Sequence, residues 1–241
     1  MKPKFLILLL VSAAAVIGVA FFLLQTQPAP VASPPPPVVK RMSADALSTL
    51  TAKAEAGDPA AQMSLGKMYL EGTSVKADPK QAVKWFQLAA EKNVPEALAM
   101  LGELTQAGQG VPQNVEEAAR LYRRAAEAGN VAGQYNLAFL YEQGTGVKQD
   151  ETEAAKWYQL AAEGGDPLAQ YDIGQRYLLG VGVAKNQVQA FKWLALAAAQ
   201  GQPDSSKLLP DLKRQMSGAD LAEAGRLVKE FTSRSPAPAG N

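Results

Sequence analysis

The sequence predicts an all-α fold: an α/α superhelical solenoid of four 36-residue helix pairs with terminal capping helices, preceded by one transmembrane helix. Three observations predict it. An internal period of 36 residues runs from Asp58 to Gly201, apolar residues follow helical spacing inside each period, and an uncharged apolar run lies near the N-terminus. The 241 residues therefore divide into an anchor, a linker and one repeat array.

The composition shifts along the chain set the expected segment boundaries. They are a transmembrane segment at 1–24, a proline-rich linker at 25–42, an N-terminal capping helix at 43–57, four repeats at 58–93, 94–129, 130–165 and 166–201, C-terminal capping helices at 202–232 and a disordered tail at 233–241.

The apolar run Phe5–Leu24 has the length of a membrane span. Twenty residues rise about 30 Å as a helix, which matches a bilayer core. The two lysines before the run favour a cytoplasmic N-terminus. A cleaved signal peptide is the alternative, but its apolar core is usually about 7–15 residues, and Pro30 disfavours cleavage after Ala29 or Ala32. The sequence predicts a single-pass inner-membrane protein with a periplasmic solenoid, or a protein released to the periplasm after cleavage.

The linker that follows is rich in proline. Its run Pro34–Pro37 favours an extended polyproline II spacer of about 3.1 Å per residue. A ligand for a proline-binding module is the alternative.

The repeat is visible as columns of similar residues at a step of 36, without insertions. The columns include Trp85, Leu121, Trp157 and Trp193; Leu65, Leu101, Leu137 and Ile173; Gly72, Gly108, Gly144 and Gly180; and Ala82, Ala118, Ala154 and Ala190. A helix pair cannot bury its apolar faces alone, so the units are expected to stack.

Each unit is predicted to hold two helices, A and B. In the first unit, helix A spans 59–71 and ends at a glycine. Gly66, inside this helix, leaves room for a neighbouring helix to pack closely. Helix B opens with an Asp or Asn three residues before a Glu or Gln, which resembles a capping box. These pairs are Asp78 and Gln81, Asn114 and Glu117, Asp150 and Glu153, and Asn186 and Gln189. Helix B ends at Asn93, Gly129, Gly165 and Gly201.

The ends of the array are predicted to be caps. Residues 43–56 align with the second half of a missing unit. Near the C-terminus, Ser217 and Asp220 open an amphipathic helix, and an irregular segment at Leu208–Met216 is expected before it. Polar terminal elements of this kind keep a stacked array soluble.

The composition excludes several classes of site. The chain has no Cys and no His, which excludes disulfides, thiol nucleophiles, Ser-His-Asp triads and sites with Cys or His ligands. The four basic residues before residue 42 leave 20 basic against 23 acidic residues after it, a net charge of −3 that suits nucleic acid poorly. Glycine pairs such as Gly108 and Gly110 lack the strand and the Lys-Ser/Thr of a phosphate-binding loop. We therefore expect no enzyme, no cofactor, no metal and no nucleic-acid partner.

The repeat resembles the Sel1-like repeat family, a relative of the tetratricopeptide repeat. The third unit carries the pattern most fully, in Leu137, Tyr141, Gly144-Thr-Gly-Val147, Ala154, Trp157 and Ala161-Ala162. The second unit departs most, with Thr105 for Tyr and Leu121 for Trp. The resemblance implies a solenoid whose A helices line a concave surface that binds other proteins. It also implies an adaptor role, frequently in the bacterial envelope, and brings no catalytic residues.

A helical wheel of helix A predicts the partner-binding surface. If Leu65 and Tyr69 face the core, residues 63, 67 and 70 lie opposite, and the step of 36 extends them into columns. The candidate partner-binding residues are Met63, Lys67, Leu70, Glu103, Tyr135, Phe139, Glu142, Tyr171, Gln175 and Leu178. Aromatic residues gather towards the C-terminal half, where they are expected to anchor a partner segment, or else to pack between neighbouring A helices.

The function predicted from these features is a membrane-tethered scaffold or adaptor of the bacterial cell envelope that binds envelope proteins. The alternative is a periplasmic regulator that sequesters a membrane sensor. An envelope enzyme or glycan-binding module is a third class, but it would need carboxylates with raised pKa in a pocket, and the sequence marks none.

Overall fold

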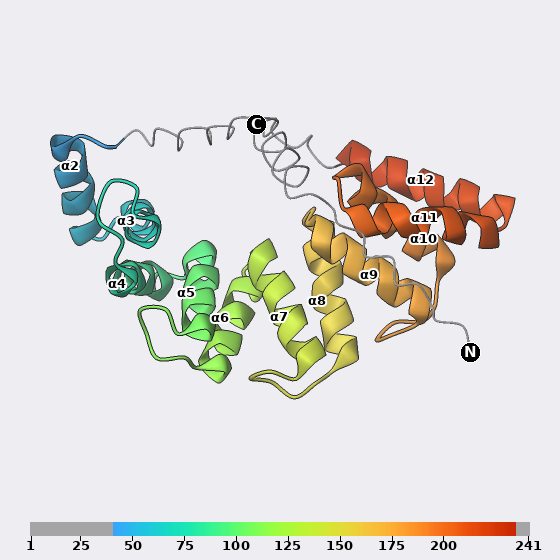
Figure 1. Cartoon of the computed structure of the whole chain (residues 1–241), viewed down its shortest axis with the longest axis horizontal. Coiled ribbons are helices and arrows are strands. Elements are labelled where there is room, and N and C mark those ends of the chain that lie inside the picture. The colour runs from blue at the N-terminus through green and yellow to red at the C-terminus, as the bar shows by residue number, and fades with distance from the viewer. Residues whose placement is uncertain (1–40, 235–241) are drawn as a thin grey trace, which may run out of the picture. The chain divides into compact units, whose positions relative to one another are not determined.

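The computed structural model describes residues 41–234, which form eleven helices joined by turns, with no strand in that range (Figure 1). The helices are α2 (Ala44–Glu55), α3 (Pro59–Glu71), α4 (Pro79–Glu91), α5 (Pro95–Ala107), α6 (Val115–Glu127), α7 (Val131–Gln143), α8 (Glu151–Glu163), α9 (Pro167–Leu179), α10 (Gln187–Ala199), α11 (Pro203–Gln215) and α12 (Gly218–Arg234). The predicted transmembrane segment and nearly all of the linker lie outside the described residues. Within 41–234, no helix is both long enough and apolar enough to span a membrane.

The helices pack in the order of the chain, which confirms the predicted solenoid. Each A helix (α3, α5, α7, α9) packs against the B helix that follows it (α4, α6, α8, α10). Each of the first three B helices packs in turn against the A helix of the next repeat. Helix α2 packs on α3 at one end, while α11 and α12 pack on α10 at the other. Contacts are therefore mostly between neighbours, as in other stacked repeats.

The apolar columns of the sequence form the core. In the first repeat Ala82, Phe86 and Ala89 are fully buried, and Trp85 is nearly so. The A helix meets this stripe at Gly66, where a Cβ atom would lie 2.4 Å from the Phe86 ring. Glycine at this position therefore allows the two helices of a pair to approach closely, as predicted.

The Asp or Asn before each B helix is its N-cap, as predicted. The side chains accept first-turn N–H bonds, for example Asp78 from the N–H groups of Lys80 and Gln81. The reciprocal half of a capping box is not among the hydrogen bonds, because the N–H of the cap donates elsewhere. The Asp78 N–H donates to the carbonyl of Tyr69 at 2.8 Å, and the three later caps bond their own A helices in the same way. The cap therefore joins the two helices of one repeat.

Two glycines shape the turn between the A and B helices. The first ends the A helix in the left-handed conformation. The second, two residues later in repeats 2–4, lies against the first turn of the preceding B helix, and a Cβ on Gly146 would lie 2.3 Å from the Val115 carbonyl oxygen. Repeat 1 has Ser74 instead, whose Oγ accepts a bond from the Met42 N–H at 3.0 Å. The second glycine therefore fits each repeat onto the preceding helix pair.

The C-terminal end differs from the prediction in two places. The segment Leu208–Met216, expected to be irregular, is helical up to Gln215 in α11. Its Pro210 is exposed, while Leu212 on the same helix is buried against α10, so packing outweighs the lost N–H bond. Helix α12 starts after Ser217, whose Oγ accepts from the Asp220 N–H, and it continues through Arg234 into the predicted tail.

Candidate functional site

The predicted partner-binding residues lie on the four A helices. Glu103 and Phe139 are exposed. Seven others are half-buried: Lys67, Leu70, Tyr135, Glu142, Tyr171, Gln175 and Leu178.

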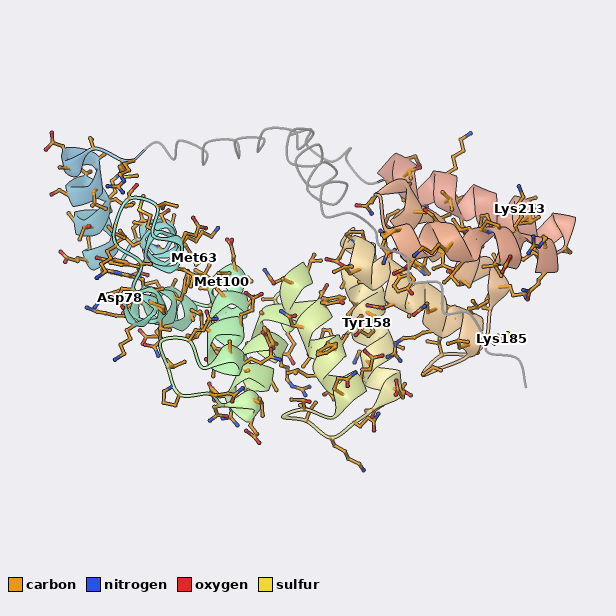
Figure 2. All side chains as sticks on the ribbon, viewed as in Figure 1. Met63, Asp78, Met100, Tyr158, Lys185 and Lys213 are labelled. Atoms are coloured by element: carbon orange, nitrogen blue, oxygen red, sulfur yellow. The ribbon has the colours of Figure 1, made fainter. Side chains whose placement is uncertain are left out.

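Met63 corrects the prediction for the first column. It is buried in the core cluster that contains Val83 and Phe86 of α4, and Figure 2 labels it. A thioether side chain is long and flexible enough to fill a gap between packed helices. Met63 therefore contributes packing and offers almost no surface to a partner.

The N-terminal half of the predicted partner-binding surface, on α3 and α5, carries charged side chains. Lys67 Nζ lies 2.7 Å from Glu96 Oε1, so this cation pairs with the next A helix. Partial loss of hydration raises the pKa of Glu103 although the residue is exposed, and the Asn136 side chain opposes the shift. This half offers charge to a partner but no aromatic side chain.

The C-terminal half carries what we call the α7/α9 surface, defined by Tyr135 and Phe139 of α7 and by Leu168 and Asp172 of α9. Tyr135 and Phe139 are one helical turn apart, as are Leu168 and Asp172. Tyr135 lies close enough to Asp172 for the carboxylate to raise the pKa of the tyrosine hydroxyl, after the larger effect of burial. Phe139 is 42% exposed and Leu168 is 48% exposed. Two large apolar side chains, one on each helix, therefore remain open to solvent.

Tyr171 and Leu178, two of the predicted partner-binding residues, are partly held in the core. Both pack at the edge of the core cluster that includes α10 and α12. The Tyr171 hydroxyl accepts a bond from Gln175 Nε2 at 2.7 Å. These residues are placed to flank the α7/α9 surface rather than to form its most exposed part.

An ionic network around the buried Arg176 side chain lies next to the α7/α9 surface. Arg176, whose side chain is 6% exposed, pairs with Glu142 Oε1 and with Glu151 Oε2, both at 2.7 Å. The Tyr158 hydroxyl donates to the other oxygen of Glu142 at 2.9 Å. The Tyr158 ring, labelled in Figure 2, meets Tyr135 edge-on at 5.5 Å and lies under the Arg176 guanidinium. The network joins α7, α8 and α9.

The sequence contains a signal for this network that the helical wheel of helix A does not use. Arg176 occupies the position of Met68, Leu104 and Leu140 in the other repeats. A charged residue in a column that is otherwise apolar must be buried, so it needs buried partners. The helical wheel predicts Glu142 as a functional residue, but it does not predict Arg176, Tyr158 or Asp172.

Asp172, the carboxyl group of the α7/α9 surface, has a raised pKa. Burial and the nearby charge of Glu142 raise its pKa to about 6, and Asp166 adds to the shift. The neighbouring Tyr135 side chain and the charge of Arg176 oppose it. No ion pair joins Asp172 to a basic side chain among residues 41–234.

We expect Asp172→Asn to raise the melting temperature near pH 7. The folded pKa lies above the value of 3.8 for a free Asp, so ionising Asp172 opposes folding above about pH 6. The gain should shrink as the pH falls and vanish below about pH 4, where both folded and unfolded chains hold the proton. Thermal denaturation between these limits tests this, with Glu127→Gln, an exposed acid on α6, as the control. An equal gain at every pH would contradict the assignment.

The arginines of α6 are engaged within the fold. Arg120 pairs with Glu117, and Arg123 donates to the Tyr141 hydroxyl. Arg124 donates to the Ala90 carbonyl at 3.2 Å and to Asn93. Among the described residues, no group of acidic side chains is arranged to hold a metal ion.

The comparisons with known proteins give one family. The Sel1 repeat matches residues 59–94, 95–130, 131–166 and 167–202. A Sel1 repeat protein from Oxalobacter formigenes is 35% identical, with 79% of each chain covered and a TM-score of 0.66. The protective antigen c5321 of uropathogenic Escherichia coli, described as having an SLR fold, is 36% identical with a TM-score of 0.67. That match covers 76% of this chain but only 40% of c5321. No curated protein sequence matches the chain.

The matched repeats lie one residue later than the units read from the sequence, and they cover the same four helix pairs. Proteins built from this repeat generally mediate protein–protein interaction, and they are generally not catalytic. The chain belongs to the Sel1 repeat family.

Proposed function

We propose that the protein is a membrane-tethered adaptor of the bacterial cell envelope, without chemistry of its own, that binds a protein partner through the α7/α9 surface. The observation that carries this proposal is Phe139, a large aromatic side chain left 42% exposed on the A-helix face. Exposed aromatic side chains with polar neighbours are preferred anchors of protein interfaces.

The surroundings of Phe139 support a binding role. Leu168 adds a second exposed apolar side chain, and Asp172 adds a carboxylate. The network of Arg176 holds α7, α8 and α9 together next to them. A partner therefore meets side chains on helices whose relative positions are already fixed, which lowers the entropy lost on binding.

The sequence before the array supports the tether. The 20 apolar residues of Phe5–Leu24 match the thickness of a bilayer, and the lysines before them favour a cytoplasmic N-terminus. The proline-rich linker would then hold the repeats away from the membrane on the outer side. An adaptor in this position presents its surface to other envelope proteins.

The test is photo-crosslinking from a residue next to Phe139 in the full-length chain, in native membranes. We expect the chain in the membrane fraction and a set of crosslinked envelope proteins. Phe139→Ala should reduce capture at least about tenfold, because an interface anchor contributes about 2 kcal/mol or more. The helical circular dichroism should not change, since Phe139 packs little.

The matched control is Leu160→Ala, which removes a 37% exposed apolar side chain from B helix α8. We expect full capture from this variant. Equal loss in both variants, or no loss in Phe139→Ala, would contradict the proposed surface. Recovery of one membrane sensor and nothing else would contradict the adaptor role, and absence from the membrane fraction would contradict the tether.

A further inference from the structure

Two carboxylates lie on the A helices either side of α7, Glu103 on α5 and Asp172 on α9. Glu103 is exposed and Asp172 is half-buried. Neither forms an ion pair within residues 41–234. Each therefore carries a negative charge that no basic side chain in this range offsets by direct contact.

Helix α7 brings both carboxylates close to Phe139. On one side of α7, the Asn136 side chain lies near enough to Glu103 to lower the pKa of that carboxyl. On the other side, Tyr135 lies next to Asp172. Tyr135 and Asn136 precede Phe139 by four and three residues, so the three side chains share one face of the helix. The exposed Phe139 ring is therefore flanked by two negative charges.

The other charges of these helices do not offset the two carboxylates. Helices α5, α7 and α9 together contain four acidic residues and one basic residue. That base, Arg176, is buried and already pairs with Glu142 and Glu151. On α5, Glu96 pairs with Lys67 of the preceding A helix. A segment that crosses the three helices therefore meets apolar side chains and negative charge, to which a basic segment is complementary.

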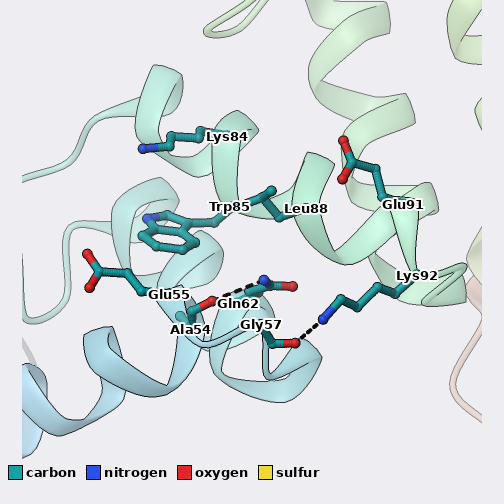
Figure 3. Close-up of a pocket in the computed structure, with 9 residues that line it drawn as sticks. All are labelled: Ala54, Glu55, Gly57, Gln62, Lys84, Trp85, Leu88, Glu91 and Lys92. Carbon is teal, nitrogen blue, oxygen red and sulfur yellow. Dashed lines mark hydrogen bonds between the residues drawn. The ribbon is translucent and has the colours of Figure 1, made fainter.

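The first repeat has no such imbalance. A pocket of about 390 Å³ between α2, α3 and α4 is lined by two acidic residues, Glu55 and Glu91, and by two basic residues, Lys84 and Lys92 (Figure 3). Lys92 also donates to the Gly57 carbonyl, so this ammonium already occupies part of the pocket. The excess of acidic groups is thus a property of the face formed by α5, α7 and α9.

The repeat itself does not require either carboxylate. The equivalents at the step of 36 are Lys67, Phe139 and Gln175 for Glu103, and Ser64, Met100 and Asn136 for Asp172. None of these residues is acidic. Ionisation of Asp172 also opposes folding, because its pKa is raised in the folded chain. A charge that the other repeats lack and that disfavours folding indicates a role in binding.

We propose that the partner segment bound by the α7/α9 surface is basic, with an apolar side chain on Phe139 between two Lys or Arg side chains, one facing Glu103 and the other facing Asp172. This inference rests on the proposed function, since it names the partner chemistry of the same surface. Packed helices lie about 8–10 Å apart, and an extended chain rises about 3.3 Å per residue. A segment running from α5 to α9 would therefore have its two cations about five to six residues apart.

The test uses the biotinylated peptide Lys-Ser-Leu-Phe-Leu-Ser-Lys, which has a lysine at each end of an apolar centre. The full-length chain in an uncharged detergent carries the photo-crosslinker next to Phe139, at a pH well above the Asp172 pKa of about 6. We expect saturable crosslinking, and at least about fivefold weaker binding of the same peptide with Glu in place of both lysines. Equal binding of the two peptides, or no saturable binding of the lysine peptide, would overturn the proposal.

Glu103→Gln and Asp172→Asn remove the two charges with little change of shape. Each variant alone should weaken binding of the lysine peptide about threefold, and the double variant should bind both peptides equally. Neither should unfold the chain, since Glu103 is exposed and Asp172→Asn is expected to stabilise it. Glu127→Gln, which removes an exposed acid from α6, is the matched control and should leave binding unchanged.

Capture in native membranes separates this inference from the proposed function. We expect both Phe139→Ala and the double acid variant to lose capture, and mass spectrometry to find basic residues on both sides of the crosslinked position in the partner. If Phe139→Ala loses capture but the double variant keeps it, the surface binds without basic recognition and only this inference fails. If Phe139→Ala also keeps full capture, the proposed surface itself fails.

Discussion

Replacing Arg176 by methionine is expected to lower the free energy of unfolding by about 3 kcal/mol. The guanidinium is 6% exposed and holds two carboxylates, one on α7 and one at the start of α8. Methionine, the residue of the first repeat at this position, fills similar volume, so the loss reports charge rather than a cavity. The value lies at the low end for buried pairs, because Glu142 and Glu151 are 35% and 40% exposed and can regain water.

The Arg176→Met variant should also show where along the array the stability is lost. Contacts in a stacked array are between neighbours, so the junction of repeats 3 and 4 should open first. Amide hydrogen exchange is expected to speed up in α8 and α9 more than in α3 and α4, while urea denaturation gives the free energy. Uniform acceleration along the array would contradict a local role.

Arg226→Met is the matched control for Arg176→Met. Arg226 also pairs with two glutamates, Glu223 and Glu230, but it lies on α12 and is 53% exposed. Exposed pairs contribute about 0–1 kcal/mol, so this variant should keep nearly full stability. Adding Glu142→Gln and Glu151→Gln to Arg176→Met should recover about half of the lost stability, since the unpaired charges are then gone.

Gly146→Ala should destabilise the protein by about 2–5 kcal/mol. Two effects combine. The backbone has φ +69°, a conformation that costs an L-residue about 1–2 kcal/mol. The new Cβ would also lie 2.3 Å from the Val115 carbonyl oxygen, at the first turn of α6, so two repeats would have to separate locally. Thermal and urea denaturation measure the total.

Gly129→Ala separates these two effects. Gly129 has φ +83°, but no atom other than those of its chain neighbours lies within 4 Å of the position of its Cβ. This variant should therefore lose only the conformational part, about 1–2 kcal/mol. If both alanine variants lost the same stability, the close approach between repeats at Gly146 would have no measurable weight.

The sequence predicts most of the fold because the same physical signals recur four times. Asp78 and its equivalents define the start of each B helix, and Gly72 and its equivalents define the end of each A helix. Features that depend on contacts between helices are not predicted. Pro210 argues for a break that packing of Leu212 on α10 overrides, and the reciprocal capping bond is lost because the Asp78 N–H has a tertiary partner.

The binding surface is harder to predict than the fold because exposure depends on neighbours. The helical wheel treats Met63 and Phe139 alike, yet one is buried under α4 and the other is exposed. The wheel also reports only one helix at a time. The raised pKa of Asp172 depends on burial and on Glu142 of α7, so this residue does not stand out without the packed array.

In repeats 2–4, the second glycine of the turn also fixes the spacing between neighbouring units. Each of these repeats packs on the preceding helix pair through the same backbone contact, so one such unit could be added or removed without a new kind of interface. The second repeat carries neither Arg176 nor any residue of the α7/α9 surface. Gain or loss of such a unit would change the distance between that surface and the N-terminal end of the array in steps while leaving the chemistry of the surface intact.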